Sequence, residues 1–180
     1  MKTLTTLLVA LFVAVQVSHA QETESAPDKP KTTVNLGIGA GLTYGGLGGR
    51  FVVNPSEVFS LFVGLGYNLD GLGYNVGPIV TIPSESRAKF YLAAMYGYNG
   101  VIVIEGLEER NKTYYGASAG VGIKLMSKRN PGSYWDFGLI VPFRSSEFKD
   151  DWDDIKNDPF IEVTGNPWPV NICIGYNFKL

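Results

Sequence analysis

Few residues of this chain could carry out chemistry, and none stands in a pattern typical of a catalytic or metal site. The only histidine, His19, lies in an N-terminal segment that we expect to be removed, so the remaining chain lacks the commonest general base and metal ligand. The single cysteine, Cys173, excludes an internal disulfide and fits a small packing residue. The residues leave a Ser–Lys or paired-carboxylate site open, but no spacing indicates one. We therefore predict no catalytic, cofactor-binding or metal-ligating residues, and no cofactor.

An acidic run, KDDWDD, occupies residues 149–154. Carboxylate oxygens are the ligands that Ca²⁺ prefers, so one interpretation is a contact with a hard cation. The run lacks the glycine and the terminal glutamate of a calcium-binding loop. We therefore expect a solvated acidic loop here.

Five charged residues stand at positions that alternate with apolar ones. One interpretation is a charge network that blocks the interior of the fold, since a charge that is buried without a partner is costly. The other is that the side chains act separately and reach out to water. The five are Arg50, Lys89, Lys124, Asp136 and Lys179.

Apolar residues recur at every second position along eight segments, which is the period of a β-strand rather than of a helix. None of these alternate positions is charged, although 18% of the chain is. In the first segment they include Leu42 and Tyr44, and in the fourth they include Pro78, which lacks an N–H and predicts a β-bulge. The segments are 34–44, 47–53, 59–69, 72–82, 90–98, 115–125, 135–143 and 170–180.

The positions between them carry mostly glycine and polar side chains, such as Asn35, Ser60 and Asn75. Eight strands close around an interior only just wide enough for side chains, so the bulky set cannot all fit inside. If the bulky set instead faces lipid, the small residues line a narrow lumen, and closure satisfies every backbone polar group. The sequence therefore predicts an all-β fold, a closed antiparallel up-and-down transmembrane β-barrel of about eight strands.

Aromatic residues are spaced as expected for two girdles around such a barrel. In three segments a pair of aromatic residues is separated by eight positions, which corresponds to a rise of roughly 19–21 Å for tilted strands. That rise approaches the ~25 Å height of the apolar band in membrane barrels. The pairs are Phe59 and Tyr67, Phe90 and Tyr98, and Trp135 and Phe143.

The joins between segments alternate in length, and the N-terminus has a different character. Short joins alternate with two long ones, 100–113 and 144–169, as in barrels with short periplasmic turns and long external loops. Residues 1–20 have the charge, apolar run and small C-terminal residues of a cleavable signal peptide. Residues 21–32 are polar and proline-containing, which predicts a disordered leader. The barrel would then occupy residues 33–180.

The net charge excludes one class of partner. Removal of residues 1–20 takes away Lys2 and leaves 14 basic against 17 acidic residues, a formal charge of −3. A nucleic-acid-binding protein would need a basic face. We therefore predict no nucleic-acid partner.

The segments together resemble the eight-stranded outer-membrane β-barrels of the OmpX-like and OmpA-transmembrane-like families. The final segment, ICIGYNFKL at residues 172–180, is similar to the C-terminal strand by which such barrels are recognised for insertion, although it ends in Leu180 where those families usually have an aromatic residue. The resemblance implies an outer-membrane location in a Gram-negative bacterium. Enzymes among these barrels use a histidine beside a serine, which the mature chain lacks, so the resemblance implies a non-enzymatic barrel.

Three functions follow as hypotheses. The first is a structural or interaction barrel with a largely blocked lumen, surrounded by outer-membrane lipid and able to contact another protein through loops 100–113 or 144–169. The second is a narrow porin-like channel for small solutes, and the third is a soluble exported barrel that binds an apolar ligand. Because the alternation continues past Tyr98, the fifth and sixth strands could project and pair with a partner's strand.

Overall fold

The fold is a closed barrel of eight antiparallel strands in which each strand pairs with the next and β8 pairs with β1. The computed structural model describes residues 32–104, 108–159, 161 and 167–180. The all-β fold predicted from the period-two pattern, a closed antiparallel up-and-down barrel of eight strands, is confirmed. The predicted signal peptide (1–20), and the leader (21–32) except for its last residue, lie outside the described residues.

The elements follow the eight predicted segments closely. In chain order they are β1 (Thr33–Gly41), the 3₁₀ helix η1 (Leu42–Tyr44), β2 (Gly46–Asn54), β3 (Phe59–Tyr67), β4 (Leu72–Thr81), β5 (Ala88–Ile102), the 3₁₀ helix η2 (Glu108–Arg110), β6 (Lys112–Met126), β7 (Tyr134–Pro142), the helix α2 (Ser146–Asn157) and β8 (Asn171–Lys179).

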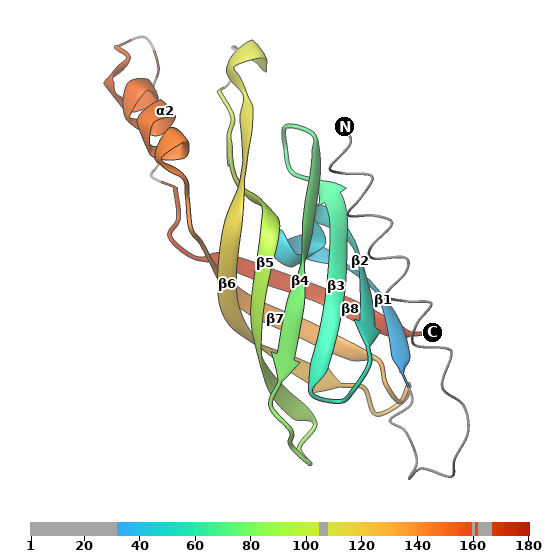
Figure 1. The fold of residues 1–180 in the computed structure, drawn as a ribbon. Coiled ribbons are helices and arrows are strands. Elements are labelled where there is room, and N and C mark those ends of the chain that lie inside the picture. Colours follow the sequence, from blue (N-terminus) through green and yellow to red (C-terminus); the bar gives the residue numbers. More distant parts are fainter. Residues whose placement is uncertain (1–31, 105–107, 160, 162–166) are drawn as a thin grey trace, which may run out of the picture.

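The two ends of the barrel differ. At the turn end, three short turns at 55–58, 82–87 and 127–133 join consecutive strands, and β1 begins and β8 ends there. At the loop end lie two short connections, 42–45 and 68–71, and two long ones, 103–111 and 143–170, the second of which contains α2. The strands β5 and β6 have 15 residues each, whereas the others have 9 or 10. Figure 1 shows that the β5–β6 hairpin extends beyond the other strands toward the end that carries α2.

The outward-facing positions are those predicted. In β3 and β4, for example, exposed apolar residues alternate strictly with more buried ones, and Val63 and Val76 face outward from paired positions. Exposure is high even for large aliphatic residues: Ile38 is 65% exposed and Leu72 is 70% exposed. The outer surface of the barrel is therefore apolar on every strand.

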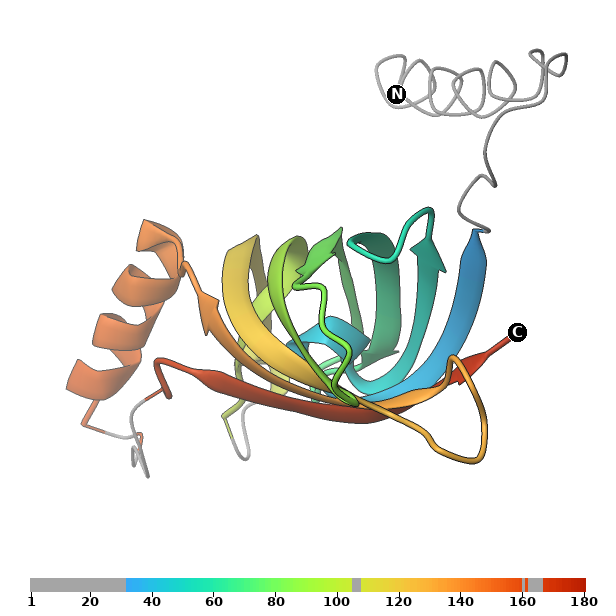
Figure 2. The same ribbon diagram turned by 90° about the horizontal axis from the view of Figure 1, so that it is seen from below.

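Two residues predicted on the outer face lie inside instead. Gly41 has a φ of 110° and Gly45 a φ of 71°, conformations that glycine adopts without strain. Between them the chain leaves the strand and turns inward as η1, so that Leu42 and Tyr44 are 2% and 0% exposed. Figure 2 shows η1 within the ring of strands. The alternating pattern predicted that the first strand runs on to residue 44, with Leu42 and Tyr44 on its outer face, and that prediction was wrong.

The barrel interior is filled by apolar and polar side chains rather than being a space lined by glycine. The inward glycines leave room for large rings: a Cβ added at Gly39 or Gly175 would meet the ring of Tyr44, and one added at Gly122 would meet the ring of Tyr91. The core cluster consists of Leu42, Val52, Phe62, Ile79, Tyr91, Ala93, Met95, Ile140 and Cys173. Glycine at these positions therefore provides the space that the inward aromatic rings occupy.

Two further predictions about local structure were wrong. The pairing of β4 with β5 keeps one register across Pro78, from Val76 opposite Tyr96 to Ile79 opposite Ala93, so no residue is inserted there. Among the strands of the described ranges, the register shifts between β5 and β6, at Tyr98 and Gly100. The acidic run at 149–154 forms part of α2 rather than a loop.

In the described residues, no helix has the length and apolarity needed to cross a bilayer.

Candidate functional site

The barrel interior contains a charge network centred on Arg50 of β2 and Asp136 of β7. The Arg50 Nη1 lies 2.9 Å from Asp136 Oδ2, and both side chains are completely buried. Arg50 also donates through Nε and Nη2 to Asn177 Oδ1, at 3.3 and 3.1 Å. Tyr44 of η1 donates to Asp136 Oδ2 at 3.3 Å and accepts from Asn177 Nδ2 at 3.1 Å. The network therefore joins β2, β7, β8 and η1 across the lumen.

Aromatic faces surround the two inward cations. The Arg50 guanidinium lies 4.6 Å from the centre of the Tyr44 ring. Lys124 of β6 is buried, donates to Thr81 Oγ1 at 2.9 Å, and lies 5.3 Å from the centre of the Tyr134 ring. Ring faces attract cations, and this attraction is stronger where water is excluded. These contacts offset part of the cost of burying both charges.

The structure brings three of the five predicted lumen charges into the interior. Arg50, Asp136 and Lys124 are buried there, whereas Lys89 is half-buried near the turn end. Lys179 is exposed, and its side chain lies where a Cβ on Gly132 would fall. Of the five, Arg50 and Asp136 therefore form an ion pair inside the barrel, Lys124 is buried and bonded to Thr81, and Lys179 reaches water.

At the loop end, α2 packs against the projecting part of the β5–β6 hairpin. The buried contact consists of Ile102, Ile104, Tyr114 and Phe148, with Trp152, Ile155 and Ile161 packed against it. The Tyr114 and Phe148 rings meet edge to face with their centres 4.9 Å apart. Ser145 caps α2 by accepting a hydrogen bond from the Phe148 N–H. We call this arrangement of α2 and hairpin the cap.

Ion pairs fix the edge of the cap. Lys112 on β6 reaches Asp151 Oδ2 at 2.6 Å and Glu147 Oε1 at 2.8 Å, and Tyr114 donates to Asp151 Oδ2 at 2.6 Å. The hydrogen bonds to Asp151 and Glu147 raise the pKa of Lys112. Those from Lys112 and Tyr114 lower the pKa of Asp151. Burial, followed by the bond to Asp151, raises the pKa of Tyr114. This edge therefore stays charged and paired at neutral pH.

A polar cavity of about 430 Å³ lies between the hairpin and α2. Its basic side chains, Arg110 and Lys112, come from the hairpin, and its carboxylates include Asp151 and Asp154 from α2. Arg110 pairs with Asp158 at 3.5 Å. Across the described ranges, no three or more His, Cys, Asp and Glu side chains are placed to hold a metal ion. The cavity is suited to contacts with polar and charged groups.

The predicted girdle aromatics lie near the two ends of the outer wall, with one exception. Phe59, Phe90 and Trp135 are exposed toward the turn end, and Tyr67 and Phe143 are exposed toward the loop end. Tyr98 is only half-exposed and packs against the interior core cluster.

The structure adds aromatic contacts that the spacing did not reveal. The Trp135 and Tyr176 rings lie 5.1 Å apart at the turn end, and the Tyr74 and Tyr115 rings lie 5.1 Å apart at the loop end. All four come from alternate positions that were already predicted to face outward, so only their neighbours across the sheet were unknown.

Helix α2 is the element of the cap that the period-two pattern did not predict. Phe148, Trp152 and Ile155 are spaced by four and three positions, which is the apolar spacing of one helix face. Ser145 directly precedes the helix and is a favoured N-cap residue. These two signals together could have identified the helix.

Comparison with known proteins gave no assignment: no protein-family model, no curated protein and no solved structure matches the chain.

Proposed function

We propose that this chain is a non-enzymatic integral outer-membrane β-barrel of a Gram-negative bacterium, similar to the OmpX-like and OmpA-transmembrane-like families, with a closed lumen and a loop end that binds a partner. The observation that carries the proposal is the apolar outer wall. Ile38 on β1, Leu72 on β4, Phe90 on β5 and Ile172 on β8 are each more than 60% exposed. Water would oppose that exposure, whereas acyl chains favour it.

The wall also argues against a soluble barrel with an apolar ligand. Such a barrel places its apolar residues inside and its polar residues outside. Here the outer face is apolar, with residues such as Leu61 and Val80 exposed, while the interior is filled by the protein's own side chains, apolar ones such as Phe62 and polar ones such as Asn75. Large contiguous apolar surfaces mark sites of contact with membranes or proteins.

The packed interior favours a closed barrel over a channel. A lumen lined by small residues would permit a narrow channel, but Tyr44 and Tyr91 occupy the space beside the inward glycines. The Arg50–Asp136 pair closes the same region with charges that are completely buried. A continuous water path would expose these groups.

The cap supports an interaction role for the loop end. It presents an exposed, mostly acidic surface on α2, with Asp150, Asp153 and Asp154 directed to solvent. Its rigid attachment through Phe148 and Tyr114 lowers the entropy that binding would otherwise cost. A protein or other ligand with basic groups complements this surface.

Detergent gels and planar bilayers test the proposal together. After membrane extraction, we expect the unheated protein to migrate faster than the heated one, because a closed barrel resists detergent until it is heated. In planar bilayers the same sample should give no steady unitary conductance steps. Recovery of the protein in the aqueous fraction, without heat-modifiable migration, would contradict the membrane location, and regular conductance steps would contradict the closed lumen.

A further inference from the structure

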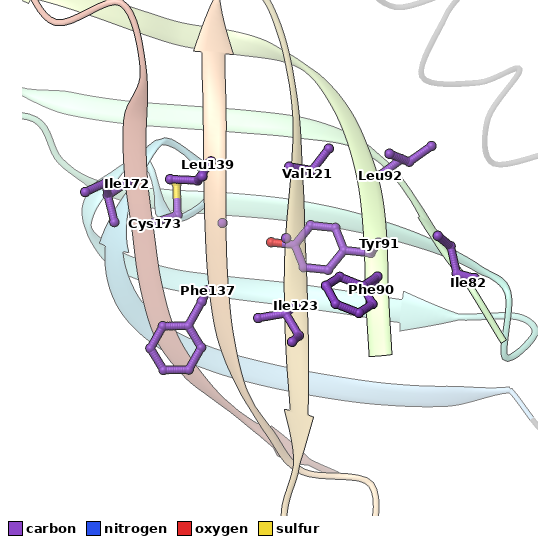
Figure 3. Close-up of a pocket in the computed structure, with 12 residues that line it drawn as sticks. Ile82, Phe90, Tyr91, Leu92, Val121, Ile123, Phe137, Leu139, Ile172 and Cys173 are labelled. Atoms are coloured by element: carbon purple, nitrogen blue, oxygen red, sulfur yellow. The ribbon is translucent and has the colours of Figure 1, made fainter. Parts of the chain in front are cut away.

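An apolar trough crosses the outer wall of the barrel over β5–β8, with a volume of about 510 Å³. It lies between two rows of outward side chains that pair in register across neighbouring strands. One row is Phe90, Ile123 and Phe137, and the other is Leu92, Val121, Leu139 and Ile172. Figure 3 shows the two rows on either side of Tyr91 and Cys173.

The row between them forms the floor of the trough. Tyr91 and Cys173 are buried, so their side chains point inward and only their backbone faces the trough. Between them lie Gly122 and Gly138, which are paired with each other and have no side chains. Three strand spacings of about 4.8 Å make the trough roughly 14 Å long.

Basic side chains lie beside the trough at the turn end. Arg87 precedes Phe90 by three residues, and Lys128 and Arg129 follow the end of β6. Arg87 donates through Nε and Nη2 to the Met126 carbonyl, at 3.1 and 2.9 Å, which holds the two turns together. All three basic side chains are exposed.

These two turns carry more positive than negative charge. Across residues 82–87 and 127–133, Glu85 is the only acidic residue and stands against three basic ones. An anionic headgroup attracts such a cluster, and Phe90, at the β5 end of the trough, lies only three residues from Arg87. The apolar trough and the basic turns therefore complement the two ends of a single lipid.

We infer that the trough and the adjacent turns bind one anionic phospholipid, with an acyl chain along the trough and the phosphate at Arg87, Lys128 and Arg129. The inference rests on the proposed membrane location. A second copy of the chain fits less well as the occupant of the trough. Two copies that pair through this face would bring their basic turns close together, and the like charges would repel. A zwitterionic lipid would fill the trough equally well, but its headgroup has no net negative charge to attract the basic turns.

Native mass spectrometry of the intact barrel in detergent tests this inference. The protein is mixed with equal amounts of palmitoyl-oleoyl phosphatidylglycerol and phosphatidylethanolamine. We expect one phosphatidylglycerol to be retained preferentially. Val121→Phe, which fills the trough with an apolar side chain, should abolish that preference. Lys128→Gln with Arg129→Gln should weaken it about fivefold for each charge removed.

Matched controls separate the site from the rest of the surface. Val63→Phe makes the same change on the outer wall of β3, and Lys149→Gln removes an exposed positive charge from α2 at the loop end, away from the basic turns. Both should leave the lipid preference unchanged. Equal retention of the two lipids, or a preference that Val121→Phe leaves intact, overturns the inference.

Heat-modifiable migration of the same samples distinguishes this failure from that of the proposed function. If the protein migrates as a closed barrel but shows no lipid preference, the lipid site alone is wrong. If the protein shows no heat-modifiable migration and needs no detergent to stay in solution, the membrane proposal fails and the lipid site fails with it.

Discussion

At the scale of single residues, the ion pair of Arg50 and Asp136 is the interior feature whose burial is most costly unless both partners are present. Both side chains are completely buried, so each charge depends on the other and on Asn177 and Tyr44 for its remaining contacts. Breaking a buried pair by removing one partner leaves an uncompensated charge, which is far more costly than removing both.

We predict that Asp136→Asn lowers the free energy of unfolding of the barrel by about 3–5 kcal/mol, because the Arg50 charge stays buried without its carboxylate. Urea unfolding in detergent, followed by the change in gel migration, measures this effect. The double variant Arg50→Met with Asp136→Leu removes both charges and should lose less than the single one. An Asp136→Asn barrel as stable as the parent would show that the pair has no such role.

The inward glycines give a second prediction at this scale. A Cβ at Gly122 would fall on the Tyr91 ring, so Gly122→Ala should lower the free energy of unfolding by about 1–3 kcal/mol, the usual cost of overpacking. The control is Gly49→Ala, where the nearest atom to the new Cβ is the Gly37 carbonyl oxygen at 3.5 Å, an ordinary contact. Equal effects of the two substitutions, in the same unfolding assay, would contradict this account of the glycines.

The interior residues also show what the sequence could not reveal. Charge and polarity marked Arg50 and Asp136 as inward, because a charge on the apolar face would break the alternation. The inward direction of apolar residues such as Phe62 and Ile140 could not be predicted in this way, because their neighbours along the strand are apolar as well. The inward turn at Leu42–Tyr44 depends on positive φ at Gly41 and Gly45, which a run of glycines permits but does not specify.

At the scale of the elements, each strand has one face in the packed core and one face on the apolar wall. Val63, at the centre of β3, is on the wall and 45% exposed. In water a charged residue at such a position would be tolerated. In a bilayer the same residue would lie near the midplane, where a charge is expensive.

We predict that Val63→Arg lowers the free energy of unfolding in a bilayer by about 2–4 kcal/mol, whereas Leu72→Arg, at the end of β4, costs about 0–1 kcal/mol. Unfolding from lipid vesicles by guanidinium measures both values. If Val63→Arg is as well tolerated as Leu72→Arg, the wall of β3 does not face lipid.

The ion pairs of the cap give a prediction of pH dependence. Asp151 has a lowered pKa in the folded state, so its contribution to holding α2 is present above the ordinary carboxyl pKa of about 3.9 and is lost as the pH falls through the lower, folded value. The raised pKa of Lys112 keeps its charge as the pH rises past the ordinary lysine value. The contact should therefore persist across the neutral range and fail only in acid.

Trp152 reports this change, because it packs against the cap cluster on α2. In a variant that retains Trp152 but carries Trp135→Phe and Trp168→Phe, we expect a red shift of emission with a midpoint below the ordinary carboxyl pKa. Adding Lys112→Met should move that midpoint upward, since Asp151 then keeps only the bond from Tyr114. An unchanged midpoint would mean that the Lys112–Asp151 pair does not hold the helix.

The elements were predictable to different degrees for physical reasons. The eight strands followed from the period of two, because one face of each strand excludes charge. The extension of β5 and β6 followed from alternation that continues past Tyr98. Helix α2 was missed because its apolar residues are few among many acidic ones. Its packing against Ile102 and Tyr114 is a contact between segments far apart in sequence, which no local pattern indicates.

At the scale of the whole molecule, the barrel is a closed cylinder with a packed interior of apolar and polar side chains and an apolar outer wall, with charge at both ends. The turn end carries Arg87, Lys128 and Arg129, and the loop end carries the acidic surface of α2. This distribution suits a molecule whose middle is surrounded by lipid and whose ends meet water. The account depends on the exposed side chains of the wall lying in acyl chains.

Quenching of Trp135 by brominated acyl chains tests that claim most directly. Trp135 stands on the outer wall of β7 and is 50% exposed, whereas Trp152 lies on α2 beyond the end of the strands. Each is studied as the sole tryptophan, with the other two changed to Phe, in vesicles of brominated phospholipid. The account predicts strong quenching of Trp135 and little quenching of Trp152. Equal emission of Trp135 in brominated and ordinary vesicles would contradict it.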